Sequence, residues 1–85
     1  MNVNVDIVPY SENNCICLEY VPGADIKLDG QNNDFCISAN AEGLLYLAKV
    51  CITLAQSDTP KGCHIHFEGF DFVQGNATDL IIERV

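Results

Sequence analysis

The sequence predicts an α+β domain: a largely antiparallel sheet of five to six strands with one long helix packed on one face. Only the stretch from Ser38 to Gln56 has the 3.6-residue periodicity of a helix. Several shorter stretches alternate apolar and polar residues, as strands with one buried face do. Turn-forming residues connect them, which favours hairpins. With 85 residues, the chain is expected to form a single domain, residues 1–85.

The predicted helix begins at Asn40, whose side-chain oxygen can accept a hydrogen bond from a free N–H group of the first turn. Residues 57–60, Ser-Asp-Thr-Pro, end it, because proline cannot continue a helix. Its apolar arc spans about 220°, wider than the stripe of an ordinary surface helix. The residues expected to face the sheet are Leu44, Leu47, Ala48, Cys51 and Ile52. The side expected to face solvent carries Glu42, Lys49, Thr53 and Gln56, with Tyr46 beside them.

The predicted strands occupy residues 2–8, 15–21, 24–29 and 35–39 before the helix, and residues 63–68 and 80–85 after it. Each has an apolar face that is expected to point toward the helix. These faces are Val3/Val5/Ile7, Ile16/Leu18/Tyr20, Ala24/Ile26/Leu28, Phe35/Ile37/Ala39 and Cys63/Ile65/Phe67. Residues 30–33, Gly-Gln-Asn-Asn, tolerate positive φ and predict a hairpin turn. Residues 69–78 are expected to form an irregular connection.

Twelve acidic residues against four basic ones give a net charge of −8 at pH 7. This charge speaks against binding to nucleic acid or to an anionic membrane, since both need a basic surface. It is compatible with a basic protein partner, and also with a role in solubility alone. The sequence predicts neither a membrane span nor a signal peptide. Its five cysteines, an odd number, favour reduced thiols and a cytoplasmic location.

One pattern is suited to a metal. His64, His66 and Glu68 alternate along a predicted strand, so their side chains share a face. Cys15 and Cys17 alternate along another strand, and imidazole and thiolate ligands would converge on zinc if the two strands were neighbours. The alternative is an ordinary polar face, with cysteines that pack as small hydrophobic residues. We favour the alternative and expect no metal site.

The sequence does not predict an enzyme. A nucleophilic cysteine needs a base, and Cys63 and His64, being adjacent in a strand, face opposite sides of it. The glycine-rich patterns that bind phosphate groups do not occur in the sequence. We therefore expect no catalytic residue and no cofactor.

From Gly43 to the C-terminus, the sequence resembles a family of small bacterial immunity proteins of polymorphic toxin systems. The resemblance rests on Gly43-Leu44-x-x-Leu47-Ala48, Leu54-Ala55, Pro60-x-Gly62-x-His64-x-His66 and Asp79-Leu80-Ile81-Ile82-Glu83. The segment Asn76-Ala77-Thr78-Asp79 departs from the Gly-Ser-type turn expected before the last strand. The resemblance implies an α+β fold, a cytoplasmic location and one function, which is to bind and block a cognate toxin without catalysis.

For an immunity protein, the acidity of the chain favours a basic toxin, such as a nuclease. The predicted toxin-binding surface combines acidic residues with aromatic anchors: Glu68, Phe70, Asp71, Phe72, Asp79 and Glu83. The alternative surface is the solvent-facing side of the helix, with Glu42 and Tyr46.

Two other functions stay open on the sequence alone. One is a small metal- or thiol-dependent protein that uses Cys15, Cys17, His64 and His66. The other is a structural dimerisation module. A homodimer is also compatible with the immunity function, and it would form through Leu45, Val50 or the edge of the sheet.

Overall fold

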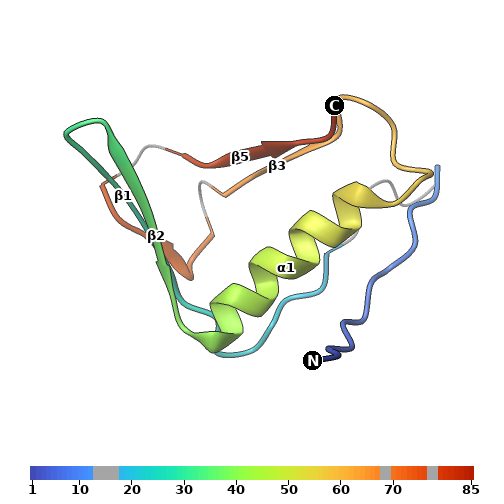
Figure 1. Ribbon diagram of the computed structural model, residues 1–85, viewed down its shortest axis with the longest axis horizontal. Helices are drawn as coiled ribbons and strands as arrows, with labels where there is room; N and C mark the ends of the chain where they lie inside the picture. Colours follow the sequence, from blue (N-terminus) through green and yellow to red (C-terminus); the bar gives the residue numbers. More distant parts are fainter. Residues whose placement is uncertain (13–17, 68–69, 77–78) are drawn as a thin grey trace.

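The computed structural model describes residues 1–12, 18–67, 70–76 and 79–85 (Figure 1). Its elements are β1 (Ile26–Gln31), β2 (Asp34–Ala39), α1 (Ala41–Ala55), β3 (His64–His66), β4 (Val73–Gln74) and β5 (Ile81–Glu83). The strands form two sheets, one of three strands in the order β2-β1-β4 and one of two strands, β3-β5. The predicted α+β class is confirmed, but the prediction of one sheet with five to six strands is wrong.

Part of the difference lies in the two N-terminal stretches that were predicted as strands. Residues 1–12 and 18–21 contain no β-strand, and residues 15–17 lie outside the described part of the chain. β1 pairs antiparallel with β2 along its length and parallel with β4 at Ile26 and Lys27, so the start of β1 has a strand on both sides. Alternation predicts a face to be buried but names no partner strand. The N-terminal segment instead reaches the end of α1, where Gln56 Nε2 donates to the Val8 carbonyl at 3.3 Å.

The β1–β2 hairpin follows the sequence prediction closely. Gln31 pairs with Asp34 at the end of the ladder, which leaves Asn32 and Asn33 as a two-residue turn. Their φ angles of 51° and 70° lie in the left-handed region, which asparagine tolerates better than most residues. The predicted hairpin is therefore confirmed, and Figure 1 shows its tip projecting away from α1.

Asn40 is the N-cap of α1, as predicted. Its Oδ1 accepts hydrogen bonds from the backbone N–H groups of Gly43, at 2.8 Å, and Asp25, at 3.0 Å. Its Nδ2 donates to the Gly23 carbonyl at 2.8 Å. One side chain thus closes the first turn of the helix and fastens it to the segment that leads into β1.

The last turn of α1 is held by side chains from outside the helix. Arg84 Nη1 donates to the carbonyls of Leu54 and Gln56, both at 2.9 Å. Thr59 Oγ1 donates to the Thr53 carbonyl at 3.0 Å. Carbonyls at a helix C-terminus lack an intrahelical donor, and a cation is favoured at this negative end of the dipole. The sequence predicted the end of the helix but not the role of Arg84.

Replacement of Arg84 by glutamine should lower the free energy of unfolding by about 1 kcal/mol, because two helix carbonyls lose a charged donor. The matched control is Lys61→Gln, which removes the same charge from an exposed loop residue and should cost less than about 0.5 kcal/mol. Urea denaturation of the two variants measures the difference. Equal shifts would mean that the Arg84 bonds do not stabilise the helix end.

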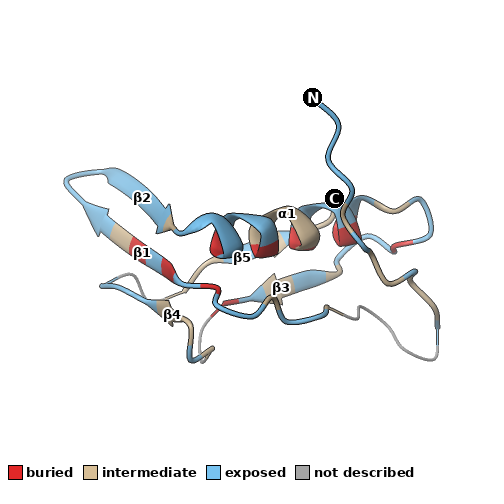
Figure 2. Ribbon diagram, turned by 90° about the horizontal axis from the view of Figure 1, so that it is seen from below, coloured by how far each residue is buried: buried red, intermediate tan, exposed pale blue. Residues whose placement is uncertain are grey.

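The core lies between α1, β1 and the residue that follows β3. Its buried apolar residues are Ala24, Ile26, Leu28, Tyr46, Val50, Leu54 and Phe67. The predicted inward faces within residues 24–28 and 63–67 are confirmed, because Cys63 and Ile65 also pack, partly buried, against this cluster. Figure 2 shows that the buried residues of α1 lie along one side of the helix.

That side is not the one predicted from the helical wheel. Tyr46, Val50 and Thr53 are 4%, 0% and 2% exposed, whereas Leu44 and Ile52 are 55% and 43% exposed. The expectation that Leu44, Cys51 and Ile52 face the sheet and that Tyr46 and Thr53 face solvent is therefore wrong. An apolar arc this wide does not define one direction of burial.

Gly43 explains the direction that the helix takes. It belongs to the buried residues of α1. A Cβ atom at this position would lie 2.6 Å from the Asp25 carbonyl oxygen and 3.0 Å from Ile26 Cγ1. The absence of a side chain thus lets the helix backbone rest directly against the start of β1.

Three more inward faces are only partly buried: Leu18 and Ala39 pack against the core, but other members of these faces are exposed. Val3 is 56% exposed, Tyr20 is 57% exposed, and Phe35 and Ile37 are 50% and 40% exposed. Because α1 rests on β1, β2 is left at the edge of its sheet with little cover on either face. Residues 1–12 and 18–21 belong to neither of these two sheets.

Candidate functional site

The turn that precedes β4 carries the candidate site. The backbone N–H of Val73 donates to the Phe70 carbonyl at 3.0 Å, which closes a turn over residues 70–73. The Ile26 N–H donates to the Phe72 carbonyl at 2.8 Å, which fastens this turn to β1. Asp71 occupies an exposed corner of the turn, between the two phenylalanines. The three side chains therefore start from a backbone that the sheet holds in place.

The aromatic rings around this turn support one another. Phe70 and Phe72 stack with their centroids 5.3 Å apart and an angle of 10° between the ring planes. Tyr20 lies 5.5 Å from Phe72 at 52°, and Tyr46 lies 5.0 Å from Phe72 at 77°. Such pairs contribute roughly 0.5–1.5 kcal/mol each beyond the area they bury. Phe72 is thus held between rings that come from α1, from the segment before β1 and from its own turn.

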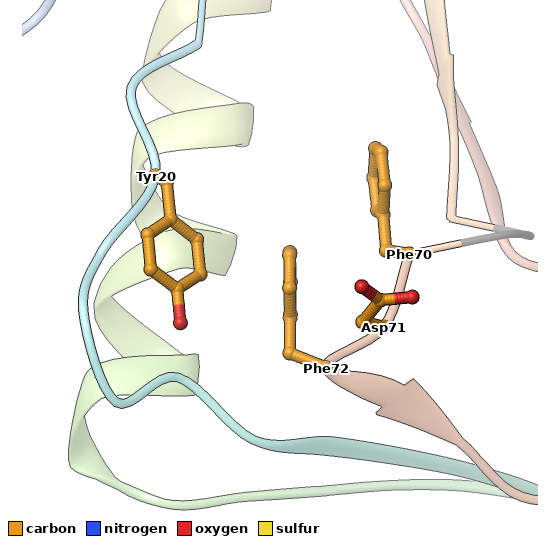
Figure 3. A pocket seen from close by; sticks show the side chains of 4 residues that line it. All are labelled: Tyr20, Phe70, Asp71 and Phe72. Carbon is orange, nitrogen blue, oxygen red and sulfur yellow. The ribbon is translucent and has the colours of Figure 1, made fainter.

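An open pocket of about 570 Å³ lies at this cluster, and we call it the aromatic–acidic pocket. It is lined by Tyr20, Phe70, Asp71 and Phe72. In Figure 3, Tyr20 and Phe70 lie on opposite sides of Phe72, and the Asp71 carboxylate lies beside the two phenylalanines. A smaller hollow of about 330 Å³ shares the three aromatic residues and continues to His64 and His66. The concave surface therefore extends from the turn before β4 to β3.

The chemistry of this pocket is suited to a cation with an apolar stem. Within the described residues, Asp71 makes no hydrogen bond or ion pair, so its carboxylate is available to a partner. The faces of aromatic rings attract a guanidinium or ammonium group, and the rings also cover the methylene groups of arginine or lysine. A carboxylate beside such rings adds a charged hydrogen-bond acceptor.

Tyr46 forms the inner wall of this region rather than part of an exposed helix surface. Its ring packs edge-on against Phe67, Phe70 and Phe72. Burial raises the pKa of the Tyr46 phenol above its usual value of 10.0, because the ionised form loses hydration. The prediction that Tyr46 stands on the solvent-facing side of the helix is wrong, since α1 turns this residue into the core.

The other predicted binding residues lie on different elements. Asp79 Oδ1 accepts from the backbone N–H groups of Phe67, at 3.0 Å, and Leu80, at 2.8 Å, and its Oδ2 lies 2.7 Å from His66 Nδ1. This carboxylate therefore links β3 to β5 within the fold. Glu83 is exposed on β5, and Glu42 is exposed in the first turn of α1.

Glu68 lies outside the described residues. Of the predicted set, the structure thus brings together Phe70, Asp71 and Phe72 and joins Tyr20 to them. The alternation of Ile16, Leu18 and Tyr20 predicts a buried strand face for Tyr20. The only signal in its favour was an aromatic residue directly before the turn residues Val-Pro-Gly, and this signal does not name Phe72 as its neighbour.

The described residues do not assemble a metal site. Among them, no group of three or more histidine, cysteine, aspartate or glutamate side chains is arranged to hold a metal ion. His64 and His66 are exposed on β3, as predicted, with ring centroids 5.0 Å apart. Cys15 and Cys17, the other ligands of the zinc alternative, fall outside the described residues. In the part of the chain that the structure covers, no helix is long and apolar enough to cross a membrane.

Comparison with known families identifies the chain. The family model for Immunity protein 32 matches residues 36–85, which is more than half of the sequence. The match contains α1, β3, β4 and β5 and three of the four residues that line the aromatic–acidic pocket, whereas Tyr20 lies before it. Searches of curated proteins and of solved structures found no significant match. The predicted resemblance to immunity proteins is confirmed, and the chain belongs to the Immunity protein 32 family.

Proposed function

We propose that this protein is a non-enzymatic immunity protein that binds a cognate bacterial toxin in the cytoplasm and blocks it. Its family supports a role in neutralising a toxin. Its net charge of −8 favours a basic partner, and nucleases that bind nucleic acid have such surfaces. Opposite charges on the two proteins accelerate association and orient the partners.

The observation that carries this proposal is the aromatic–acidic pocket. Rigid aromatic rings around an exposed carboxylate are typical of the anchor points that dominate protein interfaces. We assign the pocket to an arginine or lysine side chain of the toxin, with Asp71 as its ion-pair partner and Tyr20 and Phe70 as its apolar walls. The remaining acidic residues, among them Glu83 and Glu42, then act mainly through long-range attraction.

Replacement of Asp71 by asparagine should weaken toxin binding about tenfold or more, because the bound cation loses its counter-charge. The matched control is Asp58→Asn, which removes one negative charge from an exposed residue of the loop after α1. The control should change only the association rate, slightly, and less as salt shortens the Debye length to about 8 Å or below. Surface plasmon resonance with the toxin encoded beside this protein gives both rate constants.

Tyr20→Ala tests the aromatic part of the pocket with little risk to the fold, because Tyr20 is 57% exposed. It should mainly raise the dissociation rate, as expected for an anchor that is covered in the complex. If Asp71→Asn and Tyr20→Ala both bind the toxin as the wild type does, the pocket is not the interface. If the wild-type protein binds no toxin of its own locus, the immunity function itself is wrong.

The mode of inhibition distinguishes binding from catalysis. A non-enzymatic inhibitor abolishes toxin activity at a fixed stoichiometric ratio, and the toxin regains activity when the complex is dissociated. Titration of the toxin with this protein should therefore reach a sharp end point. Inactivation of excess toxin by a small amount of the protein would contradict the proposal.

A further inference from the structure

The side of α1 that faces away from the core is apolar and exposed. We call it the outer helix face and define it by Ala41, Leu44, Leu45, Ala48, Cys51, Ile52 and Ala55. Leu44, Leu45 and Ile52 are 55%, 43% and 43% exposed. No charged residue belongs to this face, although the chain carries sixteen in total, twelve acidic and four basic. In Figure 2, the exposed side of α1 lies opposite its buried residues. A helix that is apolar on both sides normally buries both.

The residues of this face repeat symmetrically about Ala48. Small residues stand at Ala48 and seven positions before and after it, at Ala41 and Ala55. Large residues stand three and four positions before Ala48, and a cysteine and an isoleucine stand three and four positions after it. A two-fold axis through Ala48, perpendicular to the helix, therefore maps small positions onto small ones and the leucines onto Cys51 and Ile52. Such self-complementarity is what an interface between two identical chains requires.

We propose that the occupant of the outer helix face is a second copy of this chain, with the two α1 helices packed antiparallel about this axis. The alanines allow the helix axes to approach to about 9 Å, within the range of close helix packing. Leu44 and Leu45 of each copy then cover Ile52 and Cys51 of the other.

Charge favours a second copy over a basic toxin as the occupant. A basic protein is attracted to carboxylates, and the outer helix face has none. Two copies with a net charge of −8 each repel one another, but at this face they meet without removing any ionised group from water. The repulsion between whole molecules is screened by salt, so salt should strengthen the dimer. Salt should instead weaken toxin binding through the acidic surface, because it screens the attraction between opposite charges.

The size of the face predicts a weak dimer. The 15 residues of α1 span about 22 Å, and a helix is roughly 10 Å wide. One helix pair therefore covers less than the roughly 800 Å² per partner of a standard stable interface. We therefore expect the dimer to have a dissociation constant in the micromolar range.

Disulfide trapping with an introduced cysteine tests this geometry. In a background without other cysteines, in which Cys15, Cys17 and Cys36 become serine and Cys51 and Cys63 become alanine, the variant Ala48→Cys places a single thiol on the two-fold axis. The Cα atoms lie about 2.3 Å from each helix axis, so with axes about 9–10 Å apart the two copies of residue 48 are about 4.4–5.4 Å from each other, within the roughly 4.4–6.8 Å that a disulfide allows. Mild oxidation should convert most of the 9.3 kDa protein into a species of twice that mass on a non-reducing gel.

The matched control is Ala41→Cys in the same background, an exposed alanine on the same face. In the antiparallel pair, the two copies of residue 41 are about 21 Å apart, so they should not crosslink. A mixture of Ala41→Cys and Ala55→Cys proteins should crosslink to each other, because the axis brings these positions together. Equal crosslinking of Ala41→Cys and Ala48→Cys alone, or none by Ala48→Cys, would overturn the proposal.

Sedimentation of the protein without introduced cysteines provides a second measurement. The dimer fraction should rise when the salt concentration is raised from about 50 to about 500 mM, because the Debye length falls from above about 10 Å to below about 8 Å. The variant Leu44→Glu should be monomeric and should keep the melting temperature of the wild type. If the wild type stays monomeric at millimolar concentration while Leu44→Glu weakens toxin binding, the face belongs to the toxin and this inference is wrong. The toxin affinity of Asp71→Asn is independent of that result, so failure of the dimer leaves the proposed function standing.

Discussion

Replacement of Phe67 by alanine should lower the free energy of unfolding by about 3–5 kcal/mol. Phe67 is 0% exposed and is among the largest fully buried side chains of the described residues. Its ring packs edge-on against Tyr46 and Phe70, with centroids 6.2 Å from each. Removal of the ring leaves a cavity at the point where α1, β3 and the turn before β4 meet. Since small domains are stable by only about 5–15 kcal/mol, the variant should be close to unfolding at 37 °C.

The matched control is Phe35→Ala, which makes the same change on the edge strand β2, where Phe35 is 50% exposed. It should cost less than about 1 kcal/mol, as surface substitutions usually do. Urea denaturation followed by circular dichroism gives both values. If the two variants lose equal stability, the core is not centred on Phe67. If Phe35→Ala loses more, β2 is covered by something in solution, and the hairpin is not the open edge described above.

The start of the helix and the β1–β2 turn were predictable because local chemistry determines them. Asn40 caps α1 through a hydrogen bond to an N–H only three residues away. Asn32 and Asn33 adopt positive φ in a two-residue turn that their own conformational preference favours. Such features depend on residues that are close together in the sequence, so the sequence alone is enough to predict them.

The direction of burial and the pairing of strands were not predictable in the same way. Leu44 and Val50 are equally apolar, yet one is 55% exposed and the other 0% exposed. What decides between them is the contact of Gly43 with Asp25 and Ile26, which are distant in the sequence. Residues 2–8 do alternate between apolar and polar side chains, but the strands that pair with β1 are β2 and β4.

The candidate site contains both kinds of feature: residues that are neighbours in the sequence and a residue that only the fold brings to them. Phe70, Asp71 and Phe72 are consecutive, so the sequence already places an aromatic residue on each side of an acid, and all three line the pocket. Tyr20 joins them from fifty residues away, through a ring contact with Phe72 at 5.5 Å. Asp79 appeared equally suitable for a partner from its charge, but its hydrogen bonds to Phe67 and Leu80 are internal. Only the tertiary structure distinguishes Asp79, whose carboxylate links β3 to β5, from Asp71, whose carboxylate is available to a partner.

Gly43→Ala tests the contact of the helix with the start of β1 directly and should lower the free energy of unfolding by about 1–3 kcal/mol. The new Cβ would lie 2.6 Å from the Asp25 carbonyl oxygen, which is backbone and cannot turn aside as a flexible side chain would. This same carbonyl accepts a hydrogen bond from the Asn40 N–H at 3.2 Å, so relief of the clash disturbs the N-cap. Overpacking of this kind usually costs about 1–3 kcal/mol, and loss of the cap adds about 1 kcal/mol. The gain in helix propensity from glycine to alanine, about 1 kcal/mol, offsets only part of the loss.

The alternative orientation of α1 predicts the opposite sign for this variant. If Leu44, Cys51 and Ile52 faced the sheet, Gly43 would lie at the margin of the buried side, and alanine there would stabilise the helix by up to about 1 kcal/mol. Gly30→Ala is the control, because its Cβ would meet nothing nearer than the Asp34 carbonyl at 3.8 Å. Urea denaturation should show a loss for Gly43→Ala and no comparable loss for Gly30→Ala. The double variant with Asn40→Ala supplies a further measurement. Since both changes act on one cap, the double variant should lose less stability than the sum of the two single losses. A stabilised or unchanged Gly43→Ala protein would mean that the helix does not rest on Asp25, and the outer helix face would then be the buried one.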